Sequence, residues 1–129
     1  MSNEIFVFGS NLAGIHGAGA ALYARNYHGA VMGQGIGHHG DSYGIPTKSA
    51  CIKTLPIEAI EKYVEDFMWY AHTHPELTFM VTRIGCGLAG YTDQQIAPLF
   101  LLAPLNCQFD RAWQPWLKDK YTYWGKSFA

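Results

Sequence analysis

The sequence predicts an α/β fold in which a mostly parallel mixed sheet carries helices on both faces. Two short runs, Ile5–Phe8 and Leu77–Thr82, are rich in the apolar, β-branched and aromatic residues typical of strands buried on both faces. Each run leads into a glycine-rich loop, and each loop leads into a segment with helical features. Strands that alternate with helices form parallel sheets, whose ligands bind at the carboxyl ends of the strands.

The first strand ends at Gly9 and should lie at the centre of the sheet, because it contains only apolar residues. After a loop at residues 10–17, alanines at helical spacing followed by Gly29 predict a helix with a glycine stop. Residues 30–32 form a candidate strand. The next twelve residues, 33–44, contain five glycines, so we expect a mobile loop there.

A short strand at Tyr43–Thr47 should lie at the edge of the sheet or end early, because Pro46 cannot donate a ladder hydrogen bond. Apolar residues recur at helical spacing from Ile57 to Ala71, with Pro56 in the first turn, where a missing N–H does no harm. This pattern predicts a long amphipathic helix.

The start of a third helix is marked by Thr92 and Gln95, which have the spacing of a capping box. Pro98 in its second turn should kink this helix. A last strand is expected at Asn106–Phe109. Residues 110–129 form an aromatic tail, which we expect to pack on the same single domain of residues 1–129.

Composition limits the partners and the compartment. The 129 residues are 49% hydrophobic, which is enough for one core, and the formal net charge is −1. Without a broad cationic surface, the chain is not expected to bind duplex nucleic acid directly. No apolar segment approaches about 18 residues and no signal peptide is evident, so we expect no membrane partner. Three widely spaced cysteines suit a reducing cytoplasm, and the oligomeric state is left open.

The first glycine-rich loop is a candidate phosphate site. Gly14, Gly17 and Gly19 allow positive φ, and the free N–H groups at the start of the following helix favour an anion. The alternative is a turn whose glycines simply let the helix pack closely on the strand.

The second loop, RIGCGLAGYT, repeats the arrangement, and two such loops at one sheet edge suit a diphosphate. Because Asp93 would repel an anion at the start of the next helix, we expect the phosphates to lie against Gly85–Leu88. Cys86 is a candidate nucleophile, but its apolar setting without a neighbouring base favours a packed thiol.

Polar residues outside the two loops are further candidates. Lys48 ends a small apolar strand, where burial would lower the pKa of its amine and make it nucleophilic; a solvated surface lysine is the alternative. His39 and Asp41 are candidates for a loop-borne general acid or base that closes over the site. Adjacent histidines such as His38 and His39 rarely bind one ion, so we expect no metal, and no pattern indicates a cofactor.

Three motifs occur in a recognisable order. They are Ser10-Asn11 followed by HGAGAA at 16–21, IPTK at 45–48 and TRIGCGLAGY at 82–91. On these motifs the chain resembles macrodomains, most closely the branch that contains the terminal ADP-ribose glycohydrolase and its bacterial relatives. The resemblance covers roughly residues 4–109 and implies a three-layer macrodomain-like fold that binds ADP-ribose or an ADP-ribosylated substrate.

The resemblance also implies roles for individual residues. Asn11 would contact the distal ribose. Amides for that ribose and a phosphate would come from Gly17, Ala18, Gly19 and Ala20. The residues that would close over the diphosphate are Ile84, Gly85, Cys86, Gly87 and Leu88.

Catalysis in the glycohydrolase branch uses a lysine that attacks the anomeric carbon, and Lys48 stands at that position. Ala89 occupies the position of the aspartate that completes that mechanism. Many macrodomains also hold the adenine amino group with an aspartate before the first strand, where this chain has Asn3 and Glu4. Three functions stay open: an ADP-ribosyl hydrolase acting on modified protein or nucleic acid, a non-catalytic ADP-ribose reader, and a binder of another nucleotide.

Overall fold

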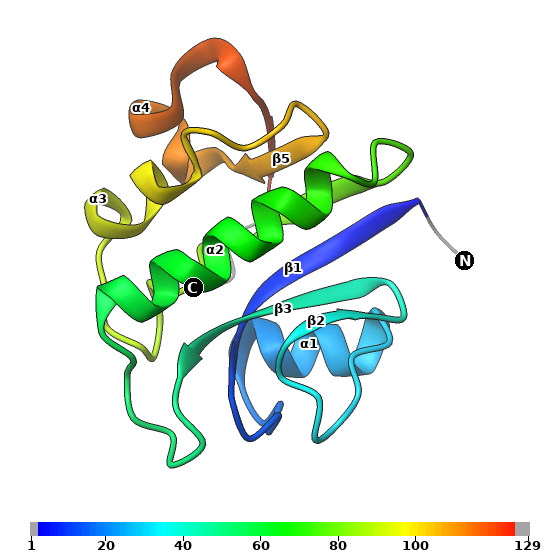
Figure 1. The fold of residues 1–129 in the computed structure, drawn as a ribbon, viewed down its shortest axis with the longest axis vertical. Coiled ribbons are helices and arrows are strands. Elements are labelled where there is room, and N and C mark those ends of the chain that lie inside the picture. Colours follow the sequence, from blue (N-terminus) through cyan, green and yellow to red (C-terminus); the bar gives the residue numbers. More distant parts are fainter. Residues whose placement is uncertain (1–2, 126–129) are drawn as a thin grey trace.

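The computed structural model describes residues 3–125 and has the expected α/β architecture (Figure 1). The strands are β1 (Glu4–Asn11), β2 (Gly37–His39), β3 (Ser42–Lys48), β4 (Thr78–Val81), β5 (Cys107–Asp110) and β6 (Thr122–Trp124). The α-helices are α1 (Gly19–Tyr27), α2 (Ile57–His72), α3 (Asp93–Ile96) and α4 (Gln114–Leu117). Short 3₁₀ helices are η1 (Ala97–Phe100), η2 (Arg111–Trp113) and η3 (Lys118–Lys120).

The strands form one mixed sheet in the order β2-β3-β1-β4-β5-β6. Only the β2–β3 pair is antiparallel among these neighbours, and every other pair is parallel. Strand β1 lies inside the sheet. Along the chain, β3 is added next to one side of β1, and β4 is added later next to its other side. A reversal of this kind leaves a crevice at the carboxyl end of the first strand, where open α/β sheets bind ligands.

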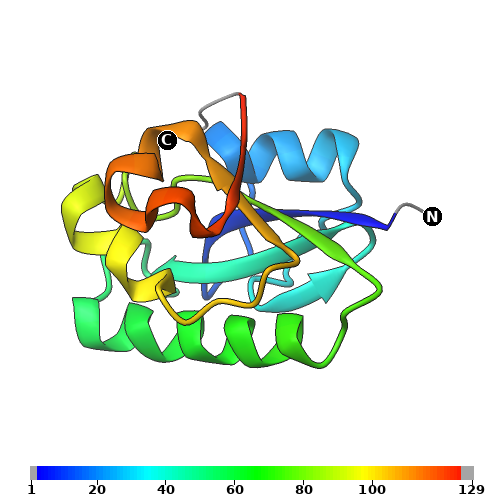
Figure 2. The ribbon, with the colours of Figure 1, turned by 90° about the horizontal axis from the view of Figure 1, so that it is seen from above.

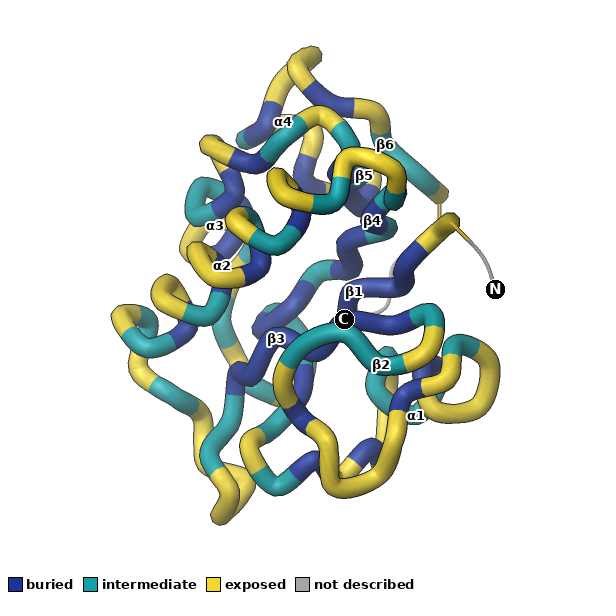
Figure 3. Tube along the Cα trace, turned by 45° about the vertical axis from the view of Figure 1, so that its right-hand side comes forward, coloured by how far each residue is buried: buried dark blue, intermediate teal, exposed yellow. Residues whose placement is uncertain are grey.

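The sheet lies between two layers of helices. Helix α1 covers one face and α2 the other (Figure 2), and α3 and α4 add Ile96 and Leu117 to the same core cluster as α2. The buried stripe of α2 follows the predicted helical spacing and consists of Ile60, Val64, Phe67 and Ala71. The buried centre of the sheet and the exposed outer turns are visible along the chain trace in Figure 3. The prediction of an α/β fold with a mostly parallel mixed sheet and helices on both faces is therefore confirmed.

The prediction of a mobile loop at residues 33–44 was wrong, because this segment contains β2 and the start of β3. Its glycines allow backbones to approach closely. A Cβ added at Gly35 would lie 1.9 Å from the carbonyl oxygen of Asn11, and one at Gly44 would lie 2.6 Å from that of Gly35. Close approach accounts for Gly35 and Gly44, whereas Gly33 and Gly37 have positive φ of 88° and 87°.

The expected edge position of Tyr43–Thr47 holds around Pro46 but not at the start of the strand. Strand β3 pairs with β1 along its length, whereas β2 pairs only with Ser42, Tyr43 and Gly44. Because β2 does not reach Pro46, the missing proline N–H breaks no β2–β3 ladder bond. The candidate strand at residues 30–32 does not form. The chain has no regular structure at residues 30–31 and makes a turn at residues 32–33.

The carboxyl-terminal segment is more regular than expected. Strand β5 is not the last strand, because β6 adds a parallel neighbour to it. The side chains of Trp113 and Leu117 are buried in the same core cluster as residues of α2 and η1. At Pro98 the α3 helix gives way to the 3₁₀ helix η1, as expected for a proline in a second turn. No helix within residues 3–125 has both the length and the apolar character needed to cross a membrane.

Candidate functional site

A cleft of about 240 Å³ opens at the carboxyl ends of three neighbouring strands. Residues at the ends of β1, β3 and β4 line it, and the loops that follow these strands complete its walls. The full lining set is Gly9, Ser10, Asn11, Ile15, Gly17, Ala18, Gly19, Ala20, Ala21, Thr47, Lys48, Ile52, Thr82, Arg83, Ile84, Gly85, Gly87, Leu88 and Ala89. The structure thus brings both glycine-rich loops and Lys48 to one place.

The start of α1 forms one wall of the cleft. Its N-cap residue, Ala18, provides no side-chain hydrogen bond, and the first turn holds no acidic residue. The backbone N–H groups of this turn therefore have no side-chain cap, and the helix dipole places partial positive charge there. Gly14 and Gly19 have φ of 71° and 58°, whereas Gly17 does not have the positive φ that we expected.

Side chains of the first loop hold its shape. The Asn11 amide donates to the carbonyl of Ile15 at 2.8 Å, and its oxygen accepts from the Ile15 N–H at 3.0 Å. His16 is fully buried, and its Nε2 lies 3.0 Å from the Val31 carbonyl oxygen, which ties this loop to the next turn. Asn11 lines the cleft, but both of its polar groups already support the loop.

Backbone hydrogen bonds that involve its glycines close the second loop. Gly85 has a φ of 75°, and its carbonyl accepts from the Tyr91 N–H at 2.9 Å. The Gly90 N–H donates to the carbonyl of Gly87 at 3.0 Å. A Cβ on Gly9 would lie 3.4 Å from the Gly85 nitrogen, so the loop packs directly over the end of β1.

Cys86 belongs to this loop but not to the cleft lining, because its side chain packs against the core. Burial, and secondarily the negative charge of Asp93, raise the pKa of the Cys86 thiol to about 12. A thiol with so high a pKa is a poor nucleophile. This environment agrees with the packed-thiol interpretation of the sequence.

Arg83 is a cleft residue that the sequence analysis did not single out. Its Nε and Nη2 each donate to Asp93 at 2.8 Å, one to each carboxylate oxygen. The Trp113 indole donates to the same carboxylate at 2.8 Å. Partial burial acts to raise the pKa of Asp93, but the hydrogen bonds from Arg83 and Trp113 outweigh it and lower the pKa. Asp93 is therefore neutralised by a forked ion pair, which weakens the repulsion of anions that we expected from it.

Lys48 ends β3 on the third wall of the cleft, beside Asn11 in the β1–β3 register. Ala89 also lines the cleft, and its carbonyl accepts from the Thr54 hydroxyl at 2.9 Å. Because Lys48 and Thr54 form an antiparallel bridge, this side-chain hydrogen bond links the lysine-bearing hairpin to the second glycine loop.

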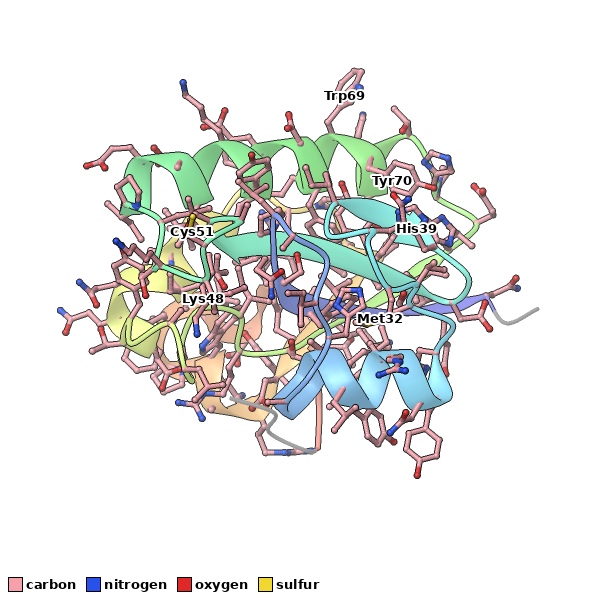
Figure 4. The ribbon with its side chains drawn as sticks, turned by 90° about the horizontal axis from the view of Figure 1, so that it is seen from below. Met32, His39, Lys48, Cys51, Trp69 and Tyr70 are labelled. Atoms are coloured by element: carbon pink, nitrogen blue, oxygen red, sulfur yellow. The ribbon has the colours of Figure 1, made fainter. Side chains whose placement is uncertain are left out.

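His39 and Asp41 do not lie in this cleft. They flank the β2–β3 turn, at the opposite end of β3 from Lys48, and seven strand residues separate the two ends by about 20 Å. Figure 4 shows Lys48 and Cys51 at one end of the sheet and His39 at the other. His39 Nε2 lies 3.1 Å from the Ile36 carbonyl oxygen. Neither residue is placed to act as an acid for Lys48.

Asn3 and Glu4 are also remote from the cleft, because they lie at the amino end of β1. Glu4 lines a separate cavity of about 580 Å³ together with Phe6, Tyr23 and Trp124. The structure therefore does not bring the candidate adenine contacts together with the two glycine-rich loops.

The charge of the cleft is one-sided. Among the described residues that line it, the basic side chains are those of Lys48 and Arg83, and no Asp, Glu, His or Cys is among them; Arg83 is paired with Asp93 outside the lining. The other lining residues are small, hydroxyl-bearing, amide or aliphatic. Backbone amides beside the Lys48 side chain, with no carboxylate among the described lining residues, provide the chemistry of an anion site.

No family model, curated protein or solved structure matches the chain. Within residues 3–125, no three His, Cys, Asp or Glu side chains are grouped so that they could hold a metal ion.

Proposed function

We propose that this protein binds ADP-ribose, or a close relative, with the diphosphate in the cleft at the carboxyl end of β1. One observation carries the proposal: both glycine-rich loops and the Lys48 side chain line a single cleft, and no acidic side chain is among the described residues that line it. The macrodomain-like motifs support the choice of ADP-ribose among the possible diphosphate ligands. The free thiols suit a reducing compartment, and we expect the protein to act in the cytoplasm.

Each wall has a distinct task in this proposal. The uncapped first turn of α1 would hold one phosphate, and the loop at residues 84–88 would close over the other. Lys48 would balance part of the charge, because Arg83 is already paired with Asp93. At about 240 Å³ the cleft is smaller than the roughly 300–1,000 Å³ of sites that enclose whole drug-sized ligands, so we expect it to hold the diphosphate and the adjoining ribose.

Calorimetric titration with ADP-ribose and AMP tests the proposal. ADP-ribose should bind at least about tenfold more tightly, because its second phosphate and distal ribose engage the loop amides, and tenfold corresponds to about 1.4 kcal/mol. Equal affinity for the two ligands would contradict the diphosphate site. ADP and NAD in the same series would identify a binder of another nucleotide.

An ADP-ribosyl hydrolase is the second candidate, because Lys48 lies on the cleft wall where it would meet the distal ribose. A lysine that attacks the anomeric carbon needs a group that protonates the departing oxygen, and such help contributes about 10²–10⁴ in rate. The described cleft residues include no such acid, and Ala89 takes the place of the family's aspartate. We therefore propose slow hydrolysis at most, with binding as the main activity.

This second activity is measured as the amount of ADP-ribose that the protein releases from ADP-ribosylated protein and from ADP-ribosylated DNA. Lys48→Ala should abolish any turnover, whereas Asp41→Ala and His39→Ala should leave it unchanged, because both residues lie at the far end of β3. Tight binding without turnover by the wild type would assign the protein to the readers. Full turnover in Lys48→Ala would exclude the lysine mechanism.

A further inference from the structure

Ile52 has an unusual backbone for its residue type. Its φ is 61°, in the left-handed region that a β-branched side chain disfavours. Within residues 3–125, Lys118 is the only other non-glycine residue with positive φ. Strained positions of this kind persist where the surrounding structure enforces them, and they concentrate at functional sites.

The turn that contains Ile52 is of a type that normally uses glycine. The Ile52 N–H donates to the Ser49 carbonyl at 3.0 Å, and the Ser49 N–H donates to the Lys53 carbonyl at 2.8 Å. A three-residue hairpin loop of this form combines a turn with one left-handed residue, which is favoured as glycine. The chain has isoleucine there, against the local preference.

Two contacts fix this hairpin beside the second glycine loop. The Thr54 hydroxyl donates to the Ala89 carbonyl at 2.9 Å, and the Tyr91 hydroxyl donates to the Leu55 carbonyl at 2.6 Å. The Ile52 side chain consequently lines the cleft on the same wall as Lys48, and 43% of the residue is exposed.

The hairpin offers a ligand different chemistry from the other two walls. Its own backbone N–H groups are used internally, since those of Cys51 and Lys53 donate to the Ser49 hydroxyl at 3.3 Å. It therefore has few amides for a phosphate and presents an aliphatic side chain instead. An aliphatic surface beside the cation of Lys48 suits the uncharged carbon face of a sugar that follows a phosphate.

We infer that Ile52 is a specificity-determining residue, which packs against the sugar beyond the diphosphate and distinguishes nucleoside diphosphate sugars from free nucleoside diphosphates. This inference rests on the proposed function. The strain at Ile52 is tolerated because the contact with the sugar requires a side chain at that position.

The test compares ADP-ribose and ADP as calorimetric ligands for wild type and for Ile52→Gly. The variant should lose at least about fivefold in affinity for ADP-ribose and less than twofold for ADP. Its Tm should rise by about 2 °C, because glycine relieves the left-handed strain. Lys118→Gly is the matched control: it also removes a strained side chain, but far from the cleft lining, so both affinities should be unchanged.

Two results would overturn the inference while leaving the proposed function standing. One is an unchanged ratio of ADP-ribose to ADP affinity in Ile52→Gly. The other is a fall in Tm, which would mean that Ile52 serves folding. Wild-type protein that binds neither ligand would overturn the proposed function and this inference together.

Discussion

The two glycine-rich loops follow neighbouring strands and line one cleft, yet they are built differently. The first leads into a nine-residue helix whose N-cap, Ala18, makes no side-chain bond. The second leads into a four-residue helix with a complete capping box at Thr92 and Gln95. The first turn of α1 has no acid, whereas that of α3 has Asp93, which is paired with Arg83.

This difference separates a helix start that is open to an anion from one that is closed. At the first loop the helix start is left open toward the cleft, so its N–H groups are available to an anion. At the second loop the helix start is already satisfied by side chains, and Arg83, which follows β4, is paired with Asp93 in the first turn of α3. Loops that look alike in sequence therefore differ in how much positive potential they leave uncompensated.

The largest effect is expected from blocking the second loop. Gly87→Val should lower ADP-ribose affinity more than about hundredfold, since three added carbon atoms fill part of a cleft of about 240 Å³. The fold should survive, because Gly87 is a half-buried loop residue. Gly125→Val is the control, because a Cβ there meets nothing within 4 Å. Undiminished calorimetric affinity in folded Gly87→Val would remove this loop from the site.

A substitution at Ala18 would make the first loop resemble the second. Ala18→Asp should cap α1 and stabilise the protein by about 1 kcal/mol, while the new carboxylate lowers ADP-ribose affinity by about tenfold or more. Ala18→Asn provides a similar cap without the charge, so it should lower the affinity by less than Ala18→Asp, because it only competes for the first-turn N–H groups. Wild-type affinity in both variants would show that the start of α1 does not bind the anion.

The Arg83–Asp93 pair should contribute to stability in a pH-dependent way. Because the folded pKa of Asp93 is lowered, its contribution is present above the unfolded carboxyl pKa of about 4 and is lost as pH falls through the folded pKa. Asp93→Asn should therefore lower the free energy of unfolding by about 1–2 kcal/mol at pH 7, and the difference from wild type should shrink near pH 3.

Urea unfolding at both pH values measures this difference. Asp119→Asn is the control, because it removes the same charge from an exposed residue. Within the described residues Asp119 has no ion pair like that of Asp93 with Arg83, so its loss breaks no forked interaction. A difference for Asp93→Asn that is as large at pH 3 as at pH 7 would contradict a charge-based role.

The smallest effect concerns the thiols. Burial raises the pKa of both Cys86 and Cys107 to about 12, with Asp93 adding to the shift at Cys86. Iodoacetamide at pH 8 should modify the exposed Cys51 first and leave the other two largely unmodified, as measured by mass spectrometry of the native protein. Rapid modification of Cys86 would mean that the second loop opens and exposes its core-facing side.

The sequence by itself determined the elements whose signal is local. Apolar composition located β1 and β4, the spacing of Ile60, Val64 and Phe67 located α2, and the capping box at Thr92 located α3. The sequence also indicated that loops at two strand ends would share one sheet edge, because parallel strands end on the same side.

Only the tertiary structure decided which distant residues meet. The ladder places Lys48 and Asp41 at opposite ends of β3, although both belong to one short stretch of chain. The pairing of Arg83 with Asp93 joins residues ten positions apart, across the loop between β4 and α3, and no local pattern of residue types indicates it. Glycines at 35 and 44 look like loop residues, but they allow two backbones to touch. Contacts of this kind depend on strand order and packing, which a local pattern of residue types does not encode.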